Sequence, residues 1–308
     1  MSRRRRGRAV NGWLIVDKPG GMTSAAVVNK VKWLFDARKA GHGGTLDPMA
    51  TGLLPIAFGE ATKTVSHVVD GTKSYRFTLR WGSETNTDDA EGEAINQSDF
   101  RPDPVLVEQS LVDFVGRIEQ VPPRYSAIKI DGVRAYKLAR EDKAVPLSAR
   151  EIDIHEIHLI GQPDPDHTEF AVISGKGAYM RALARDIARS VGGFGHISAL
   201  RRTAVGPFDA KDAISLDELE SIGQIAAREQ KLLPVETALD DIPALAVTES
   251  EAMRLRNGQT VSLLRKVDLQ RIADFDNGDT VLAKTRTKPV ALVRYAGGEV
   301  KPFRVLNL

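Results

Sequence analysis

Cysteine is absent from all 308 residues of the chain. Its absence excludes disulfide bonds, thiolate metal sites and cysteine nucleophiles. Histidine is scarce as well, with six residues, and His42 has no potential ligands beside it at metal-binding spacing. We therefore expect neither a metal nor any other cofactor.

Long apolar runs are also missing, and none approaches the length that spans a bilayer. The first residues, MSRRRRGR, lack the apolar stretch of a secretory signal. These absences predict a cytoplasmic protein with no membrane partner. The hydrophobic fraction of 42% and charged fraction of 27% are typical of a globular protein, and the length favours two domains.

A strong net charge is missing too, but the formal +2 hides an uneven distribution. Residues 1–80 carry 14 basic and 5 acidic side chains, residues 81–243 carry 18 and 29, and residues 244–308 carry 11 and 7. The three segments therefore have net charges of +9, −11 and +4. Basic ends around an acidic middle favour a polyanion-binding protein, and the Arg3–Arg6 tail, expected to be disordered, would add salt-dependent affinity for RNA.

Hydrophobic periodicity gives a coarse outline of the elements. We expect strands at 11–16, 72–81, 151–160 and 169–174, and helices from a Ser24 cap, near 105–115 and at 178–191. The acidic stretch 82–97 has no core pattern and is expected to be a loop. Arg185 and Arg189 follow Arg181 at intervals of four, which on spacing alone indicates a solvated basic stripe.

The last part of the chain has a different pattern. Leu233-Pro234 and Ile242-Pro243 indicate a junction, preceded by two polar helical stretches. Beyond it we expect a small, mostly β domain with a Ser250-capped helix that stops at Asn257-Gly258, and strands at 281–283 and 290–295.

The segment Gly41–Pro55, GHGGTLDPMATGLLP, is the most informative part of the chain. It holds one carboxylate, Asp47, among small and mostly uncharged residues. Its glycines permit tight turns, and Asp-Pro favours an extended or turned backbone that presents the acid from a loop. Taken alone, however, an Asp-Pro pair is better explained by a turn cap than by catalysis.

Together with residues 58–63, FGEATK, this segment resembles the catalytic loop of the bacterial tRNA pseudouridine-55 synthases, the TruB family. The family pattern is close to GHxGxLDPxAxGxLP, and Gly44 and Thr45 stand where relatives often carry other small residues. Further segments follow in the family's order: VDKP at 16–19, KSY at 73–75, VPP at 121–123 with YSA at 125–127, GKGAYMR at 175–181 and LRR at 200–202. The resemblance covers the family's catalytic domain almost end to end.

The resemblance implies an α+β protein with the pseudouridine synthase fold, in which helices flank a large mixed, mainly antiparallel central sheet. It also implies a basic tail at 1–10, a catalytic domain at 11–243 and a small PUA-like RNA-binding domain at 244–308. This last domain is assigned mainly by its position in the chain.

The implied activity is the isomerisation of uridine 55 in the T-loop of tRNA to pseudouridine. The bond between uracil N1 and the ribose breaks, the base turns, and C5 rejoins the ribose. This reaction is redox-neutral, which agrees with the lack of cofactor motifs. The base must be flipped out of its stack, at a cost of a few kcal/mol. The implied partner is the T-arm stem-loop, with no obligate protein partner and a monomeric enzyme.

The family's Asp matches Asp47, which could attack the sugar, attack the ring or remove a ribose proton. The family's Arg that pairs with this Asp matches Arg181, and such a cation favours the ionised carboxylate and fixes its rotamer. Tyr75 matches the residue that stacks on the flipped base. Its alternative is core packing with Phe77 and Trp81, which the alternation of the strand favours.

Four further residues match family positions of lesser weight. Tyr179 and Leu200 match positions that line the base pocket, although both could be ordinary core residues. His42 matches a residue that occupies the RNA loop vacated by the flipped nucleotide. Lys18 would contact phosphate or support the catalytic loop, and a generic surface lysine is the alternative.

Two other functions compete with this one. A tRNA-binding or folding chaperone would have the same architecture with catalysis secondary, and the presence of Asp47, Tyr75 and Arg181 argues against it as the sole role. A hydrolase or deaminase is disfavoured because metal ligands are lacking.

Overall fold

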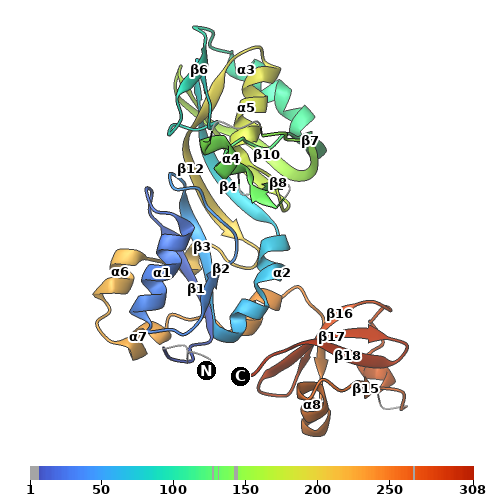
Figure 1. Cartoon of the computed structure of the whole chain (residues 1–308). Helices are drawn as coiled ribbons and strands as arrows, with labels where there is room; N and C mark the ends of the chain where they lie inside the picture. Colours follow the sequence, from blue (N-terminus) through green and yellow to red (C-terminus); the bar gives the residue numbers. More distant parts are fainter. Residues whose placement is uncertain (1–6, 127, 131, 142–144, 266–267) are drawn as a thin grey trace.

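The computed structural model describes residues 7–126, 128–130, 132–141, 145–265 and 268–308 (Figure 1). The predicted arginine tail therefore lies largely outside the described residues. Among the described residues, no helix is long and apolar enough to cross a bilayer.

A large mixed sheet forms the centre of the molecule. Its order is β13-β1-β3-β12-β4-β11-β10-β7, with β2 paired to β3. The pairs β1–β13 and β3–β12 are parallel and the others antiparallel, so the predicted mainly antiparallel sheet is confirmed. The strands are β1 Gly12–Lys18, β2 Ala40–His42, β3 Thr51–Phe58, β4 Lys73–Trp81, β7 Gly116–Gln120, β10 Arg150–Asp164, β11 His167–Ser174, β12 Gly195–Val205 and β13 Ala213–Ser215.

Strand β4 illustrates why these sequences form a sheet. Phe77 and Trp81 are buried on one face, whereas Arg76 and Arg80 are exposed on the other. This alternation, predicted from the sequence, packs the apolar side chains against α5 and its neighbours in a continuous core. The Phe77 ring stacks on Phe170 of β11 at 5.0 Å between centroids.

Helices flank this sheet, as predicted. They are α1 Ser24–Leu34, α2 Val65–Asp70, α3 Pro104–Ser110, α4 Ala135–Arg140, α5 Met180–Ser190, α6 Leu216–Ser221 and α7 Ile225–Glu229, with 3₁₀ turns η1 Gly59–Lys63, η2 Leu111–Phe114, η3 Ala210–Asp212 and η4 Val235–Leu239. The predicted Ser24 cap is wrong by one residue. Thr23 caps α1 by accepting a hydrogen bond from the Ala26 amide, and the Ser24 hydroxyl bonds elsewhere.

The acidic stretch 82–97 is not the featureless loop that its composition predicts. It contains the hairpin of β5 Ser83–Thr85 and β6 Ala94–Gln97, and Glu84 and Asp88 are buried. Both acids pair with α5, because Arg185 Nη1 lies 3.0 Å from Asp88 Oδ2 and Arg189 Nη2 lies 2.6 Å from Glu84 Oε1. The predicted solvated stripe is therefore wrong for Arg185, which is buried. Arg189 keeps 52% of its side chain exposed, and both arginines bind the hairpin to the helix.

A second sheet and its own core form the C-terminal β domain. Its order is β14-β16-β17-β18-β15, and it packs with α8. The elements are β14 Ala244–Ala246, α8 Glu249–Arg256, β15 Val261–Ser262, η5 Leu269–Arg271, β16 Thr280–Lys284, β17 Pro289–Ala296 and β18 Glu299–Val305. Thr248, rather than the predicted Ser250, caps α8 through a capping box with Glu251. The short hairpin β8 Lys129–Ile130 and β9 Val133–Arg134 precedes α4.

The two domains share a buried apolar cluster that includes residues of α2 and η4. Leu282, Leu292 and Leu306 of the C-terminal domain belong to one buried cluster with Trp13 and Phe208 of the larger domain. Polar contacts reinforce it. Lys63 Nζ donates to the Val305 carbonyl at 2.7 Å, and the Asn307 amide donates to Glu60 Oε2 at 2.7 Å.

Candidate active site

The Asp47 loop connects β2 to β3 and is held on both sides of the acid. The Ser24 hydroxyl donates to the Leu46 carbonyl at 3.0 Å and accepts from the Leu46 amide at 2.9 Å. Lys18 Nζ donates to the Pro48 carbonyl at 3.0 Å. These bonds fix the backbone directly before and after Asp47, so its carboxylate is presented from an ordered loop rather than a flexible one.

Arg181 forms a bidentate ion pair with this carboxylate through two hydrogen bonds. Its Nε donates to Asp47 Oδ2 at 2.9 Å and its Nη2 to Oδ1 at 3.1 Å. The remaining guanidinium donors reach the Thr87 carbonyl at 2.9 Å, the Tyr125 carbonyl at 3.0 Å and the Asp89 carboxylate at 3.5 Å. The Arg181 side chain is 5% exposed and that of Asp47 is 33% exposed. The buried guanidinium of Arg181 therefore fixes the Asp47 carboxylate while leaving part of it accessible to solvent.

A cavity of about 320 Å³ opens beside this pair. It is bounded by the Asp47 loop, α2, the start of β4, the turn before α5, and β12. Its lining residues are Gly44, Thr45, Leu46, Asp47, Val69, Lys73, Tyr75, Ser126, Gly175, Gly177, Ala178, Tyr179, Met180, Arg181, Leu200 and Arg202. The cavity thus brings together five of the seven predicted site residues, and Lys18 and His42 are the two outside it.

Tyr75 lies at the edge of the core and lines the cavity. It is half-buried and packs against the core cluster, while Phe77 forms the stack with Phe170 inside that core. The alternative of simple core packing therefore describes only part of its surroundings. Its cross-strand partner on β12 is Arg202, which reasoning from the sequence did not select.

Arg202 is buried beneath the loop, with 2% of the residue exposed. Its Nε donates to the Leu53 carbonyl at 2.8 Å, Nη1 to Thr45 at 3.4 Å and Nη2 to Gly44 at 3.2 Å. Gly52 permits this approach of β3 to β12. It has φ +97°, and a Cβ there would lie 2.1 Å from the Arg202 carbonyl oxygen.

Two hydrogen bonds with the Gln120 side chain fix the backbone of Tyr179. Its amide donates to Gln120 Oε1 at 2.9 Å, and Gln120 Nε2 donates to its carbonyl at 3.2 Å. Burial raises the pKa of the Tyr179 phenol. Gln120 ends β7, directly before the Val121-Pro122-Pro123 motif, and this position was the only sequence signal for its role.

Lys18 is fully buried, which makes the surface-lysine alternative wrong. Its ammonium donates to the carbonyls of Pro19, Met22 and Pro48 at 2.8, 2.7 and 3.0 Å. Burial lowers its pKa, and the nearby Asp47 charge opposes that shift. Of the two predicted roles, this geometry favours support of the catalytic loop.

His42 lies at the end of β2, at the start of the loop. Burial lowers its pKa, and the positive charge of Arg202 lowers it further. No hydrogen-bond partner for its Nδ1 is found among the described residues. A backbone hydrogen bond with Gly44 opposes the lowering of the pKa.

Lys73 is a cavity residue that was noted in a motif but not selected for the site. Its ammonium donates to the carbonyls of Val69 and Gly71 at the end of α2. Burial lowers the pKa of Lys73 to about 8, and the Arg202 charge contributes to this shift. The cavity therefore contains two cations, Lys73 and Arg202, in addition to the Asp47–Arg181 pair.

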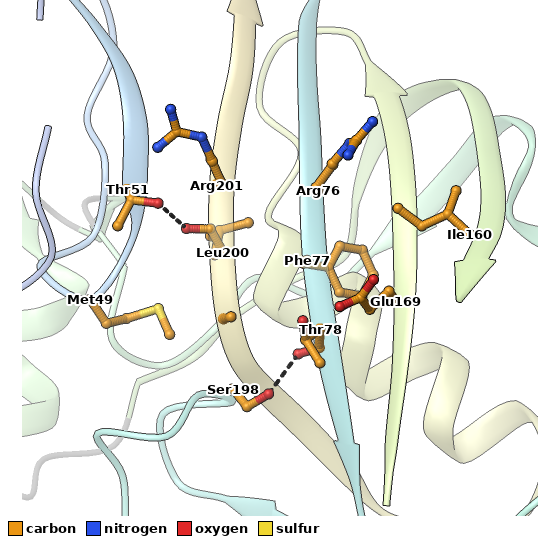
Figure 2. Close-up of a pocket in the computed structure, with 11 residues that line it drawn as sticks. Met49, Thr51, Arg76, Phe77, Thr78, Ile160, Glu169, Ser198, Leu200 and Arg201 are labelled. Atoms are coloured by element: carbon orange, nitrogen blue, oxygen red, sulfur yellow. Dashed lines mark hydrogen bonds between the residues drawn. The ribbon is translucent and has the colours of Figure 1, made fainter. Parts of the chain in front are cut away.

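A second concavity of about 440 Å³ lies on the opposite face of the sheet (Figure 2). Alternation on β4 and β12 turns Arg76 and Arg201 toward it, whereas Tyr75 and Arg202 face the Asp47 cavity. Arg201 forms a two-point ion pair with Asp17 at 3.0 and 2.8 Å. Adjacent arginines of one strand thus have unrelated surroundings.

The Asp47 cavity combines a fixed carboxylate, aromatic and aliphatic walls, and positive charge. Such a site can hold a planar ring against Tyr75 and present an acid to one edge of that ring or to a sugar attached to it. Among the described residues, no cluster of acidic and histidine side chains is placed to hold a metal ion. This arrangement suits acid-dependent chemistry on a nucleoside.

Comparison with known proteins gives full-length matches. The family model for the N-terminal domain of TruB family pseudouridylate synthases matches residues 32–180, and that for the tRNA pseudouridylate synthase B C-terminal domain matches residues 181–240. The chain is 53% identical to the tRNA pseudouridine synthase B of Rhodospirillum rubrum, covering 100% of both chains. It is 54% identical to that of Gluconacetobacter diazotrophicus, covering 99% of this chain and 100% of the relative.

A solved structure is similar as well. The pseudouridine synthase-type chain of a Cbf5-Nop10-Gar1 complex superposes with a TM-score of 0.73 at 25% identity, covering 97% of this chain and 86% of that chain. The similarity extends over both domains, because nearly the whole chain is included.

Proposed function

We propose that Asp47 is the carboxylate with which this chain isomerises uridine 55 of the T-loop. The chain belongs to the TruB family of pseudouridylate synthases and is a tRNA pseudouridine synthase. The two-point ion pair between Asp47 and Arg181, at the mouth of a cavity with an aromatic wall, is the observation that carries this proposal.

The reaction requires an ionised carboxylate beside the reacting nucleoside. The C1′–N1 bond breaks, the detached uracil turns, and a C1′–C5 bond forms. The proton on C5 is then lost while N1 gains one, so atoms and electrons balance without a co-reactant. In each of the three routes open to Asp47, namely attack on the sugar, attack on the ring or removal of a ribose proton, it acts as an anion. Arg181 holds that anion in one rotamer.

Base binding falls to the walls of the cavity. Tyr75 stacks on the flipped uracil, and Leu200 and Tyr179 contact it from the other sides. Stacking contributes about 1–3 kcal/mol per base, which offsets a flipping cost of a few kcal/mol. Lys18 keeps the loop in place, and His42 occupies the space that the flipped nucleotide leaves in the RNA.

The domain organisation follows from the same proposal. Residues 11–243 form the catalytic domain, and residues 244–308 form a PUA-like domain that binds tRNA beyond the T-arm. Residues 1–10 add a basic tail. The enzyme acts on tRNA as a monomer in the cytoplasm, without an obligate protein partner or cofactor.

Asp47→Asn tests the catalytic assignment. The amide keeps the size of the side chain but is neither a base nor a good nucleophile, so pseudouridine formation in a tRNA transcript should fall by at least about 10⁴-fold. Affinity for the same tRNA, measured by filter binding, should change by less than about threefold, since the cavity and RNA contacts remain.

Asp36→Asn is the matched control. Asp36 is exposed and has φ +46°, a conformation that asparagine tolerates. This variant should retain wild-type turnover. Retained turnover in Asp47→Asn would overturn the catalytic role of Asp47. Tight tRNA binding without turnover in wild type would instead favour the chaperone alternative, in which catalysis is secondary.

A further inference from the structure

Arg202 is a buried cation without a counter-charge. It is among the largest fully buried side chains, yet no ion pair connects it to an acid among the described residues. Arg181 and Arg185, the other buried arginines of the region, each pair with carboxylates. Burying an unpaired charge is costly, so the position of Arg202 calls for a physical explanation.

Three hydrogen bonds give part of that explanation. The guanidinium donates to the carbonyls of Gly44, Thr45 and Leu53, which lie on either side of Asp47 in the chain. Arg202 also stands directly opposite Tyr75 in the antiparallel β4–β12 pair, on the same face of the sheet. One side chain therefore bridges the loop that carries the acid and the strand that carries the aromatic platform.

The charge itself reaches the cavity. Arg202 is one of the lining residues, and its field contributes, after burial, to the lowered pKa values of Lys73 and His42. Because carbonyl oxygens satisfy the donors without cancelling the full charge, the floor of the cavity stays electropositive. An electropositive and poorly solvated floor favours any ligand state that carries negative charge there.

We propose that Arg202 is a positioning residue for the reaction. Its side chain joins Tyr75 to the Asp47 loop and places an uncompensated positive charge beneath the uracil ring. This inference rests on the proposed function. All three routes for Asp47 put negative charge on the ring. When Asp47 attacks the sugar or removes a ribose proton, cleavage of C1′–N1 leaves the bonding electron pair on N1, and the negative charge is delocalised to O2 and O4. When Asp47 attacks the ring, the negative charge is on the enolate oxygen O4.

Arg202→Gln and Arg201→Gln form a matched pair of variants. The first removes the charge but keeps an amide donor beneath the loop. The second makes the same change one residue earlier, on the opposite face of the sheet, where Arg201 pairs with Asp17. We expect the kcat of Arg202→Gln on a tRNA transcript to fall about 100-fold, with KM within about threefold of wild type. Arg201→Gln should keep kcat within about threefold.

A substrate with 5-fluorouridine at the target position separates charge stabilisation from general damage. Fluorine withdraws electrons and stabilises negative charge on the ring, so this base depends less on Arg202. The single-turnover rate, followed as loss of the fluoronucleoside after nuclease digestion, should fall only about 10-fold in Arg202→Gln. Equal losses on uridine and 5-fluorouridine would overturn the electrostatic role, and an unchanged kcat on uridine would overturn the proposal as a whole.

Thermal unfolding and circular dichroism of each variant establish whether it folds. Should Arg202→Gln fail to fold, Arg202→Lys and Tyr75→Phe carry the test. Arg202→Lys keeps the charge and loses the fork, and Tyr75→Phe keeps the ring and loses its hydroxyl. Both should lower kcat equally on the two substrates, and a selective loss on uridine in either would contradict the division of roles. A loss confined to Asp47→Asn, with both Arg202 variants fully active, would leave the proposed function standing and remove this inference.

Discussion

Three buried cations surround the Asp47 loop, and they are satisfied in two ways. Arg181 shares two bonds with the acid itself, whereas Lys18 and Arg202 each donate to three backbone carbonyls. The ion pair fixes the acid, whereas the carbonyl-bound cations fix the backbone around it. The precision of the site therefore depends on the side chains that hold the acid and its loop as well as on the walls of the cavity.

Lys73 gives a stability prediction at this scale. Its pKa falls from 10.5 to about 8 in the folded protein, with burial as the main cause, so between these values the unfolded chain binds more protons than the native one. The free energy of unfolding of wild type, relative to Lys73→Met, should therefore rise with pH from about 8 to 10.5, by up to about 1.4 kcal/mol per pH unit.

Denaturant unfolding at several pH values checks this expectation. Lys284→Met, which removes an exposed lysine of β16, serves as the control and should show a constant difference from wild type. A flat difference for Lys73→Met across the same window would show that Lys73 is not destabilised as a cation in the fold.

Asp47, Tyr75 and Arg181 were predicted from matched positions, and the structure gathers them at one cavity. Arg202 belongs to the LRR motif at 200–202, from which only Leu200 was predicted as a site residue. The bonds of Arg202 go to backbone carbonyls about 150 residues away, and any residue type supplies a carbonyl. The identity of the residues in the motif therefore did not indicate what Arg202 contacts.

At the scale of elements, the contact between α5 and the 82–97 hairpin is the main finding. Arg181, Arg185 and Arg189 reach acids of the hairpin at 3.5, 3.0 and 2.6 Å. The same i, i+4 spacing that predicted a solvated stripe in fact aligns three cations on one helix face toward a second element. The polar composition of residues 82–97 predicted a loop because apolar periodicity is the usual sign of a buried element. A segment that is buried through ion pairs does not show that periodicity.

Arg185→Met tests the energetic weight of this contact. Burial raises the pKa of Asp88 to about 6, while the Arg185 charge opposes that rise. Without Arg185, an ionised Asp88 is buried beside fewer cations, so unfolding at pH 8 should become easier by about 3 kcal/mol. At pH 5 Asp88 takes up a proton in the native state, and the loss should be clearly smaller.

The measurement is urea unfolding of wild type and variant at both pH values. Arg117→Met is the control, because Arg117 forms an exposed pair with Asp153 and should matter little at either pH. A loss in Arg185→Met that does not depend on pH would contradict a role for Asp88 ionisation.

At the scale of the whole molecule, the C-terminal domain is fixed to the side of the larger domain that carries α2. Burial lowers the pKa of His67 on α2, and the charge of Arg304 on β18 lowers it further, which places Arg304 close to α2. If this face continues the tRNA-binding surface, Arg304 contacts phosphate. Sequence position predicted a domain at this point of the chain but not that its last strand lies close to α2.

Arg304→Gln should therefore weaken tRNA binding and reduce the slope of log K against log salt concentration by about 0.9. Turnover of a T-arm hairpin should change little, since the hairpin would not reach this residue. Arg256→Gln, which changes the last residue of α8, is the control. Unchanged salt dependence in Arg304→Gln would exclude a phosphate contact.

Formation of pseudouridine at position 55 of tRNA through Asp47 can be tested on a tRNA transcript treated with the purified wild-type protein or with Asp47→Asn. Pseudouridine is then mapped nucleotide by nucleotide. Wild type should modify uridine 55 alone, and the variant should modify no uridine. An unmodified uridine 55 with wild type, or the same modification with both proteins, would show that Asp47 does not carry out this reaction.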